Sequence, residues 1–202
     1  MLFLEDHARL LLVLHTVLAV AAVATSTHLV VWLARVRRGA HGRLRAVRRF
    51  AVILAVLHGA AFAAGNLMYP TYKIQVKVGY LQNPDAVVAD GAARVRDAAQ
   101  VRRRFADRDA APPSDGEVAR ATAGLPAAAD RTARWFDAKE HWVAMGLPLS
   151  LALAFVLAAW RPEPGRGGEV GGVIMTLAIG ASASLWFAAV IGVLTASARA
   201  IG

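Results

Sequence analysis

One uncharged run, from Leu10 to Ala34, restricts the fold of this chain more than any other feature of its sequence. Its residues are mostly apolar, and Arg9 and Arg35 bound it. At about 1.5 Å per residue, a helix of this length crosses a hydrocarbon core of roughly 30 Å. Because Glu5 and Asp6 stand where a signal peptide carries positive charge, we interpret the run as a permanent transmembrane helix.

Three further uncharged stretches predict three more spans. They cover residues 50–72, 142–160 and 170–198, and the chain as a whole is 57% hydrophobic. We therefore expect an all-α membrane protein, a four-helix bundle with spans at about residues 10–34, 50–69, 141–160 and 170–197. Residues 1–202 then form one transmembrane domain, and residues 70–140 form a helical, extracytoplasmic insertion between the second and third spans.

The loop between the first two spans predicts the orientation. Residues 35–49 hold seven arginines and no acid, and short basic loops stay in the cytoplasm. Both termini and the insertion then lie outside, and a composition rich in alanine and arginine is typical of a high-GC bacterium, so we expect a bacterial inner-membrane protein. The same arginines supply most of the net charge of +9, which indicates contact with lipid headgroups rather than with nucleic acid.

Residues 73–81, at the start of the insertion, fit two patterns. Ile74, Val76 and Val78 alternate with polar residues as in a strand. Ile74, Val78 and Leu81 follow helical spacing equally well. We favour a helix slightly, because a lone strand lacks a partner.

Capping signals divide the rest of the insertion into helices. Asn83 followed by Pro84 indicates a helix start, with the asparagine as cap and the proline in the first turn. Ser114 and Glu117 have the spacing of a capping box. A further helix is expected to run from about Ala127 into the third span.

Four histidines lie in or beside the predicted spans at paired depths. His15 and His141 lie towards the outer surface, and His28 and His58 lie in the inner half. Ionisable groups in a span are costly and usually functional. Two histidines on facing helices are how a bundle holds low-spin haem b, so we interpret these pairs as the iron ligands of one or two haems, the inner pair first.

Cations near each pair would bind the haem propionates: Arg48 and Arg49 inside, Lys73 and Lys139 outside. The chain has no cysteine, which excludes covalent attachment of haem through CxxCH and cysteine-ligated iron–sulfur clusters. One point weakens the two-haem prediction. His15 and His28 are thirteen residues apart and therefore point about 140° apart around the helix axis.

The sequence suggests two other sites. A quinone is a further candidate ligand, although tyrosines also form the ordinary interfacial belt; the side chains that could bond it are Tyr69, Tyr72, Lys73 and Tyr80. Asp137 and His141 are one helical turn apart and could share a zinc ion, but no clear third ligand follows from the sequence.

The pattern favours a membrane-bound b-type cytochrome, a candidate oxidoreductase that exchanges electrons with a quinone or a partner redox protein. Two alternatives remain open. The chain could be a non-catalytic subunit or anchor of a larger complex or homo-oligomer. It could also be a small intramembrane enzyme or proton-coupled carrier, although no Asp, Glu, Lys or Arg lies deep in any span.

Overall fold

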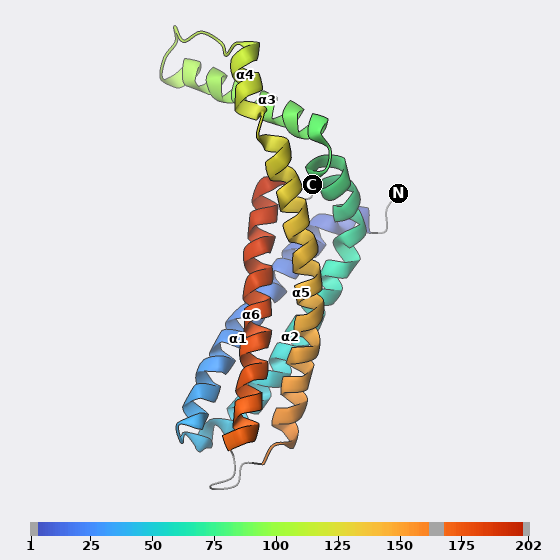
Figure 1. Ribbon diagram of the computed structural model, residues 1–202, viewed down its shortest axis with the longest axis vertical. Coiled ribbons are helices and arrows are strands. Elements are labelled where there is room, and N and C mark those ends of the chain that lie inside the picture. The colour runs from blue at the N-terminus through green and yellow to red at the C-terminus, as the bar shows by residue number, and fades with distance from the viewer. Residues whose placement is uncertain (1–3, 162–167, 200–202) are drawn as a thin grey trace.

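The computed structural model describes residues 4–161 and 168–199, and every regular element in them is a helix (Figure 1). In chain order these are η1 (Glu5–His7), α1 (Ala8–Arg37), η2 (His41–Arg43), α2 (Leu44–Thr71), η3 (Tyr72–Leu81), α3 (Pro84–Phe105), α4 (Asp115–Thr122), α5 (Leu125–Ala159) and α6 (Gly168–Ala198). The four predicted spans are confirmed as helices long and apolar enough to cross a membrane: Glu5–Arg37, Leu44–Leu81, Asp115–Ala159 and Val170–Ala198.

The four long helices pack side by side as a bundle. α1 contacts α2 and α6, and α5 contacts the same two helices, so the four form a closed ring (Figure 1). The outer surface of this ring exposes large apolar side chains such as Val17, Val56, Phe155 and Val193. Water would make that exposure costly, whereas lipid tails accept it, so the bundle has the surface of a membrane domain.

The two ends of the bundle differ. One end carries the connection between α1 and α2, and we call it the arginine-loop end. The other carries η3 and an arm, defined here as residues 84–122, which contain α3 and α4. Each end has its own buried core: Leu29, Leu33, Leu54, Leu153 and Ile174 belong to the first, and Met68, Tyr72, Val76, Leu81 and Phe136 to the second.

At the arm end, α2 continues into η3, a π-helix. The prediction of a helix over residues 73–81 is therefore confirmed. A Cβ added to Gly79 would lie 2.6 Å from the carbonyl oxygen of Ile74, five residues earlier, so the wide π turn requires glycine here. Asn83 ends this segment and caps α3 as predicted, because its side-chain oxygen accepts a hydrogen bond of 3.2 Å from the amide of Ala86.

The arm projects from the end of the bundle that carries η3 (Figure 1). Its first half is held by close packing, since a Cβ added to Gly91 of α3 would collide with the side chain of Leu125 and lie 3.1 Å from the methyl group of Thr122. The predicted capping box is also confirmed: the amide of Ser114 donates to the Glu117 carboxylate at 2.8 Å, and the amide of Glu117 donates to the Ser114 hydroxyl at 3.3 Å.

Candidate functional site

His58 on α2 is the one predicted ligand that lies in the middle of the core, with 1% of its surface exposed. Its Nδ1 lies 2.9 Å from the hydroxyl oxygen of Ser150 on α5. That hydroxyl donates its own hydrogen to the carbonyl of Gly146 at 3.2 Å. Nδ1 must therefore carry the proton and donate, which leaves Nε2 as a bare lone pair, and Nε2 is buried without a hydrogen-bond partner.

The helices around the His58 ring are in direct contact. A Cβ added to Gly146 would collide with the Ser184 hydroxyl on α6 and lie 3.2 Å from Cε1 of His58. The Ser184 hydroxyl in turn donates to the carbonyl of Trp142 at 2.7 Å. α5 and α6 thus close over the ring, and small residues make this approach possible.

His28, the predicted partner of His58, faces away from the core. Its side chain is exposed on α1, and its Nδ1 donates to the carbonyl of Ala24 on the same helix at 3.1 Å. The neighbouring Thr27 accepts a hydrogen bond of 3.0 Å from Trp186 of α6. The structure therefore does not bring His28 and His58 together.

The second predicted pair is not brought together either. His15 is half-buried between α1 and α2, where its Nδ1 donates to the carbonyl of Ala61 at 2.8 Å and its ring lies 3.2 Å from the place of a Cβ on Gly65. His141 is exposed on α5 and donates to the carbonyl of Asp137, on its own helix, at 2.8 Å.

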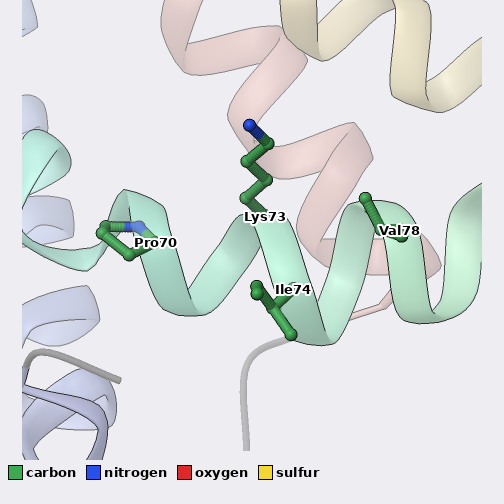
Figure 2. A pocket seen from close by; sticks show the side chains of 4 residues that line it. All are labelled: Pro70, Lys73, Ile74 and Val78. Carbon is green, nitrogen blue, oxygen red and sulfur yellow. The ribbon is translucent and has the colours of Figure 1, made fainter. Parts of the chain in front are cut away.

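The predicted propionate-binding cations also have separate surroundings. Arg48 donates to the carbonyl of Leu157 at 2.9 Å and to that of Trp160, so it caps the end of α5. Arg49 is exposed. Lys73 is exposed on η3 and rises from a shallow apolar hollow lined by Pro70, Ile74 and Val78 (Figure 2).

These positions do not fit a haem clamped between two histidines. In residues 4–161 and 168–199, the ring of His58 presents a free nitrogen to a closed core, and the three other rings bond to backbone carbonyls elsewhere. We therefore derive no electron-transfer step through haem. The presence of haem in this protein remains a prediction. The zinc interpretation of Asp137 and His141 has a competitor, because the Asp137 carboxylate pairs with Lys77 at 2.5 Å.

The arm end holds a second group of polar side chains, which we call the arm-end cluster: Thr71, Tyr72, Lys139 and His15. The hydroxyls of Thr71 and Tyr72 are buried without a hydrogen-bond partner. The ring of Tyr72 stacks on Phe136 at 3.9 Å between centroids, and the ammonium of Lys139 lies 4.6 Å from the same Phe136 ring. Phe136 of α5 thus contacts Tyr72 of η3 and Lys139 of its own helix.

Comparisons with protein-family models, with curated proteins and with solved structures return no match for this chain. A functional assignment therefore rests on the geometry of its own residues.

The arm itself carries a third candidate, at the far end of α3. Phe105 is 77% exposed there and Val101 is 57% exposed. Between them stand Arg102, Arg103 and Arg104, all exposed, and no acid in the described part of the chain forms an ion pair with any of the three. We call residues 101–105 the arm tip.

Two polar residues of the candidate sites were not predicted from the sequence. Ser150 is a lone hydroxyl in an apolar span, and its separation of 92 positions from His58 gives no sequence signal. Thr71 stands beside Tyr72 but was not singled out, because a threonine at the end of a span ordinarily bonds its own helix. Only the packing shows that the Thr71 hydroxyl is unpartnered.

Proposed function

We propose that this chain is a non-catalytic membrane subunit that docks an acidic partner protein through the arm tip. The observation that carries the proposal is the exposure of Phe105 and Val101 on either side of three arginines that pair with no acid in the described part of the chain, at the end of a long helix. Aromatic residues and arginine are the residue types that dominate the energy of protein interfaces.

The position of the arm favours a protein over a lipid surface as the partner. α5 begins at Leu125, and sixteen residues, through Glu140, precede its uncharged part. At 1.5 Å per residue this stretch is about 24 Å long. Because the headgroup layer adds only about 5–8 Å to each side of the hydrocarbon core, the part of the arm that is joined to the top of α5 stands beyond the lipid. The first half of α3 lies lower, since Asp90 is 3.8 Å from Arg199, which directly follows the uncharged part of α6.

The positive charge of the arm tip indicates the surface charge of the partner. Three adjacent arginines at the end of α3 also complement the dipole of that helix. Arg104 lies 5.6 Å from the centroid of the neighbouring Phe105 ring, so the charge and the aromatic ring form one surface. Arginine binds carboxylates in a bidentate way, so an acidic surface on the partner is complementary.

The orientation that we propose follows the basic loop. The seven arginines of residues 35–49 hold the arginine-loop end in the cytoplasm. The arm and the partner then lie on the extracytoplasmic side of a bacterial inner membrane.

The proposal can be tested by site-specific cross-linking in the source bacterium. A photo-reactive phenylalanine analogue replaces Phe105 in one variant and the lipid-facing Val52 in a control. We expect a discrete protein adduct from position 105, weakened by salt, and none from position 52. If position 105 formed no protein adduct in functional membranes, this result would contradict the proposal.

Electron transfer through haem b is a second candidate, supported by one observation. His58 has the protonation that a ligating histidine needs, because Ser150 holds Nδ1–H and leaves Nε2 bare in the core. No second ligand is brought to it. A reduced-minus-oxidised visible spectrum of the purified protein tests this candidate, since bis-histidine haem b gives a sharp band and a colourless protein removes it.

A further inference from the structure

The outer face of α1 carries a polar side chain at a place where the bundle would otherwise meet only lipid. His28 is exposed there, and its Nδ1 donates to the carbonyl of Ala24 at 3.1 Å. Because a carbonyl can only accept, Nδ1 holds the single proton of the neutral ring, and Nε2 is a bare acceptor. Within the part of the chain that the structure describes, no group donates to this nitrogen.

The depth of His28 in the membrane makes a bare acceptor costly. Seven positions, or about 10 Å of helix, separate His28 from Arg35. The neighbouring Thr27 accepts a hydrogen bond of 3.0 Å from Trp186 of α6. Trp186 is thirteen positions from the nearest charged residue of its own helix, so two helices place this level inside the hydrocarbon.

The imidazole of His28 does not reach the headgroups. It bonds to Ala24, one turn closer to the arm end, so the ring leans towards the centre of the bilayer and away from the arginine-loop end. Acyl chains carry no hydrogen-bond donor. Polar side chains inside a membrane almost always face protein or water, so we expect protein to cover this face of α1.

The shape of the face fits a helix. Its exposed residues follow alternating steps of three and four positions: Leu10, Val13, Val17, Val20, Ala24, Thr27 and Val31. One helix packs along another with this spacing, and a small residue such as Ala24 allows a close approach. The spacing alone would also suit lipid, so the bare acceptor beside it decides in favour of a transmembrane helix.

The hydrogen-bond donors around His28 are already used within the chain. The indole of Trp186 donates to Thr27, the hydroxyl of Thr27 donates to the carbonyl of Val23 at 2.8 Å, and Nδ1 of His28 donates to Ala24. A second copy related by a two-fold axis along the membrane normal would bring the same acceptors face to face. A different chain must therefore supply the donor.

We propose that α1 packs, along the face that contains His28, against a transmembrane helix of a partner protein, and that a side chain of this helix donates a hydrogen bond to Nε2. The donor is an O–H or N–H group, such as that of serine, threonine, asparagine or tyrosine. The proposal rests on the role of the chain as a membrane subunit, which the proposed function assigns, but it does not use the arm tip.

The test is photo-cross-linking from α1 in native membranes of the source bacterium. A photo-reactive phenylalanine analogue replaces Val20, which is 64% exposed and eight positions from His28, so the probe leaves the surroundings of the histidine unchanged. Val52 of α2 is the lipid-facing control. We expect a protein adduct from position 20 only. Mass spectrometry should assign its peptide to an apolar segment that can span the membrane and that contains a side-chain donor.

Variants of His28 show whether the acceptor is responsible. His28→Leu removes the acceptor and should lower the yield of the adduct at least about threefold, the loss expected for one hydrogen bond between transmembrane helices. His28→Gln keeps an acceptor oxygen and should retain most of the yield.

Two controls separate the contact with the partner from the fold. Thr16→Val should leave the yield unchanged, because it removes an exposed hydroxyl of α1 that bonds only to Leu12 of the same helix. The thermal unfolding of the purified chain should also be unchanged in His28→Leu, since the hydrogen bond of His28 lies within α1.

Three results would overturn the proposal. They are the absence of a protein adduct from position 20, an adduct formed only with a second copy of this chain, and an unchanged yield in folded His28→Leu. The two docking surfaces can be told apart. A histidine-dependent adduct from position 20 without one from position 105 would support the contact at α1 and remove the docking at the arm tip, whereas an adduct from position 105 alone would do the reverse.

Discussion

The imidazole of His58 and the hydroxyl of Ser150 join α2 to α5 by a buried hydrogen bond of 2.9 Å. Because the Ser150 hydroxyl is committed to the Gly146 carbonyl, its oxygen accepts from His58 and fixes the tautomer of the ring. Close to the same level, the Ser184 hydroxyl of α6 donates to the Trp142 carbonyl of α5 at 2.7 Å, so hydrogen bonds connect three of the four helices around the His58 ring.

Removal of the Ser150 hydroxyl should therefore destabilise the bundle. Ser150→Ala leaves the Nδ1–H of His58 buried without an acceptor, which costs about 1–3 kcal/mol. The free energy of unfolding in mixed micelles, measured by tryptophan fluorescence, checks this value. Thr16→Ala is the control, because the Thr16 hydroxyl bonds only to Leu12 of its own helix at an exposed position. Equal stability of both variants would contradict the role given to Ser150.

Gly146 should be intolerant of a side chain, whereas Gly59 should accept one. An alanine at 146 would collide with Ser184 and press on the His58 ring, and overpacking of this kind costs about 1–3 kcal/mol. A Cβ on Gly59, one residue from His58, meets no atom of the described chain within 4 Å. Gly59→Ala should be neutral or stabilising, since alanine favours helix. Thermal unfolding of the two variants measures the difference, and equal midpoints would be evidence against the close contact of α5 and α6.

The attachment of α3 to the bundle should weaken in acid. The hydrogen bond that Tyr80 donates to Asp90 at 2.7 Å, together with Arg94 and Arg199, holds the pKa of the Asp90 carboxyl below its ordinary value of 3.8. A lowered pKa means that ionised Asp90 stabilises the folded state. This contribution is complete above the ordinary value and disappears as the pH falls through the lower pKa of the folded protein.

Pepsin cleavage of the arm from pH 5 to pH 2 provides the measurement for Asp90. The wild type should resist cleavage better than Asp90→Asn at the upper end of this range and converge with it at the lower end. Dividing one rate by the other removes the pH dependence of pepsin itself. A ratio that stays constant over the whole range would show that Asp90 does not hold the arm.

Tyr72→Phe should stabilise the lipid-free protein. The change removes a buried hydroxyl that has no partner and keeps the ring stacked on Phe136, so the free energy of unfolding should rise by about 1 kcal/mol. The stability of wild type and variant is compared after delipidation. A clear loss of stability would mean that the Tyr72 hydroxyl already has a partner within the protein.

Much of the fold can be predicted from the sequence, because the length of the uncharged runs and the positions of the charges between them determine it. Uncharged runs long enough to cross a bilayer leave helices as the only choice for a chain of this kind. The caps at Asn83 and Ser114 are local signals, so both were predicted and both are confirmed. The π-helical form of the segment after α2 could not be predicted, because residues 73–81 fit an ordinary helix and a strand equally well.

The orientation of the histidines around their helices could not be predicted in the same way. The depth of a histidine in the membrane follows from counting residues along its helix. The direction in which its ring points depends on the neighbour against which that helix packs. His28 and His58 have matching depths, yet one ring faces outward on α1 and the other faces Ser150. The unpartnered hydroxyls of the arm-end cluster likewise appear only once α2, η3 and α5 are packed together.

The docking of an acidic partner at the arm tip is tested most directly by the size of the complex extracted from native membranes. The tagged protein is purified in mild detergent as the wild type, as a variant in which Arg102, Arg103 and Arg104 are changed to Glu, and as Arg131→Glu, an exposed charge on α5 outside the arm.

We expect the wild type and Arg131→Glu to elute as a complex larger than the 21.4 kDa chain in its micelle, and the triple variant to elute as the chain alone. Reversal of three charges at an interface should weaken association at least about a hundredfold. Retention of the same complex by a folded triple variant, at the same salt concentration, would contradict the central claim that the arm tip docks the partner.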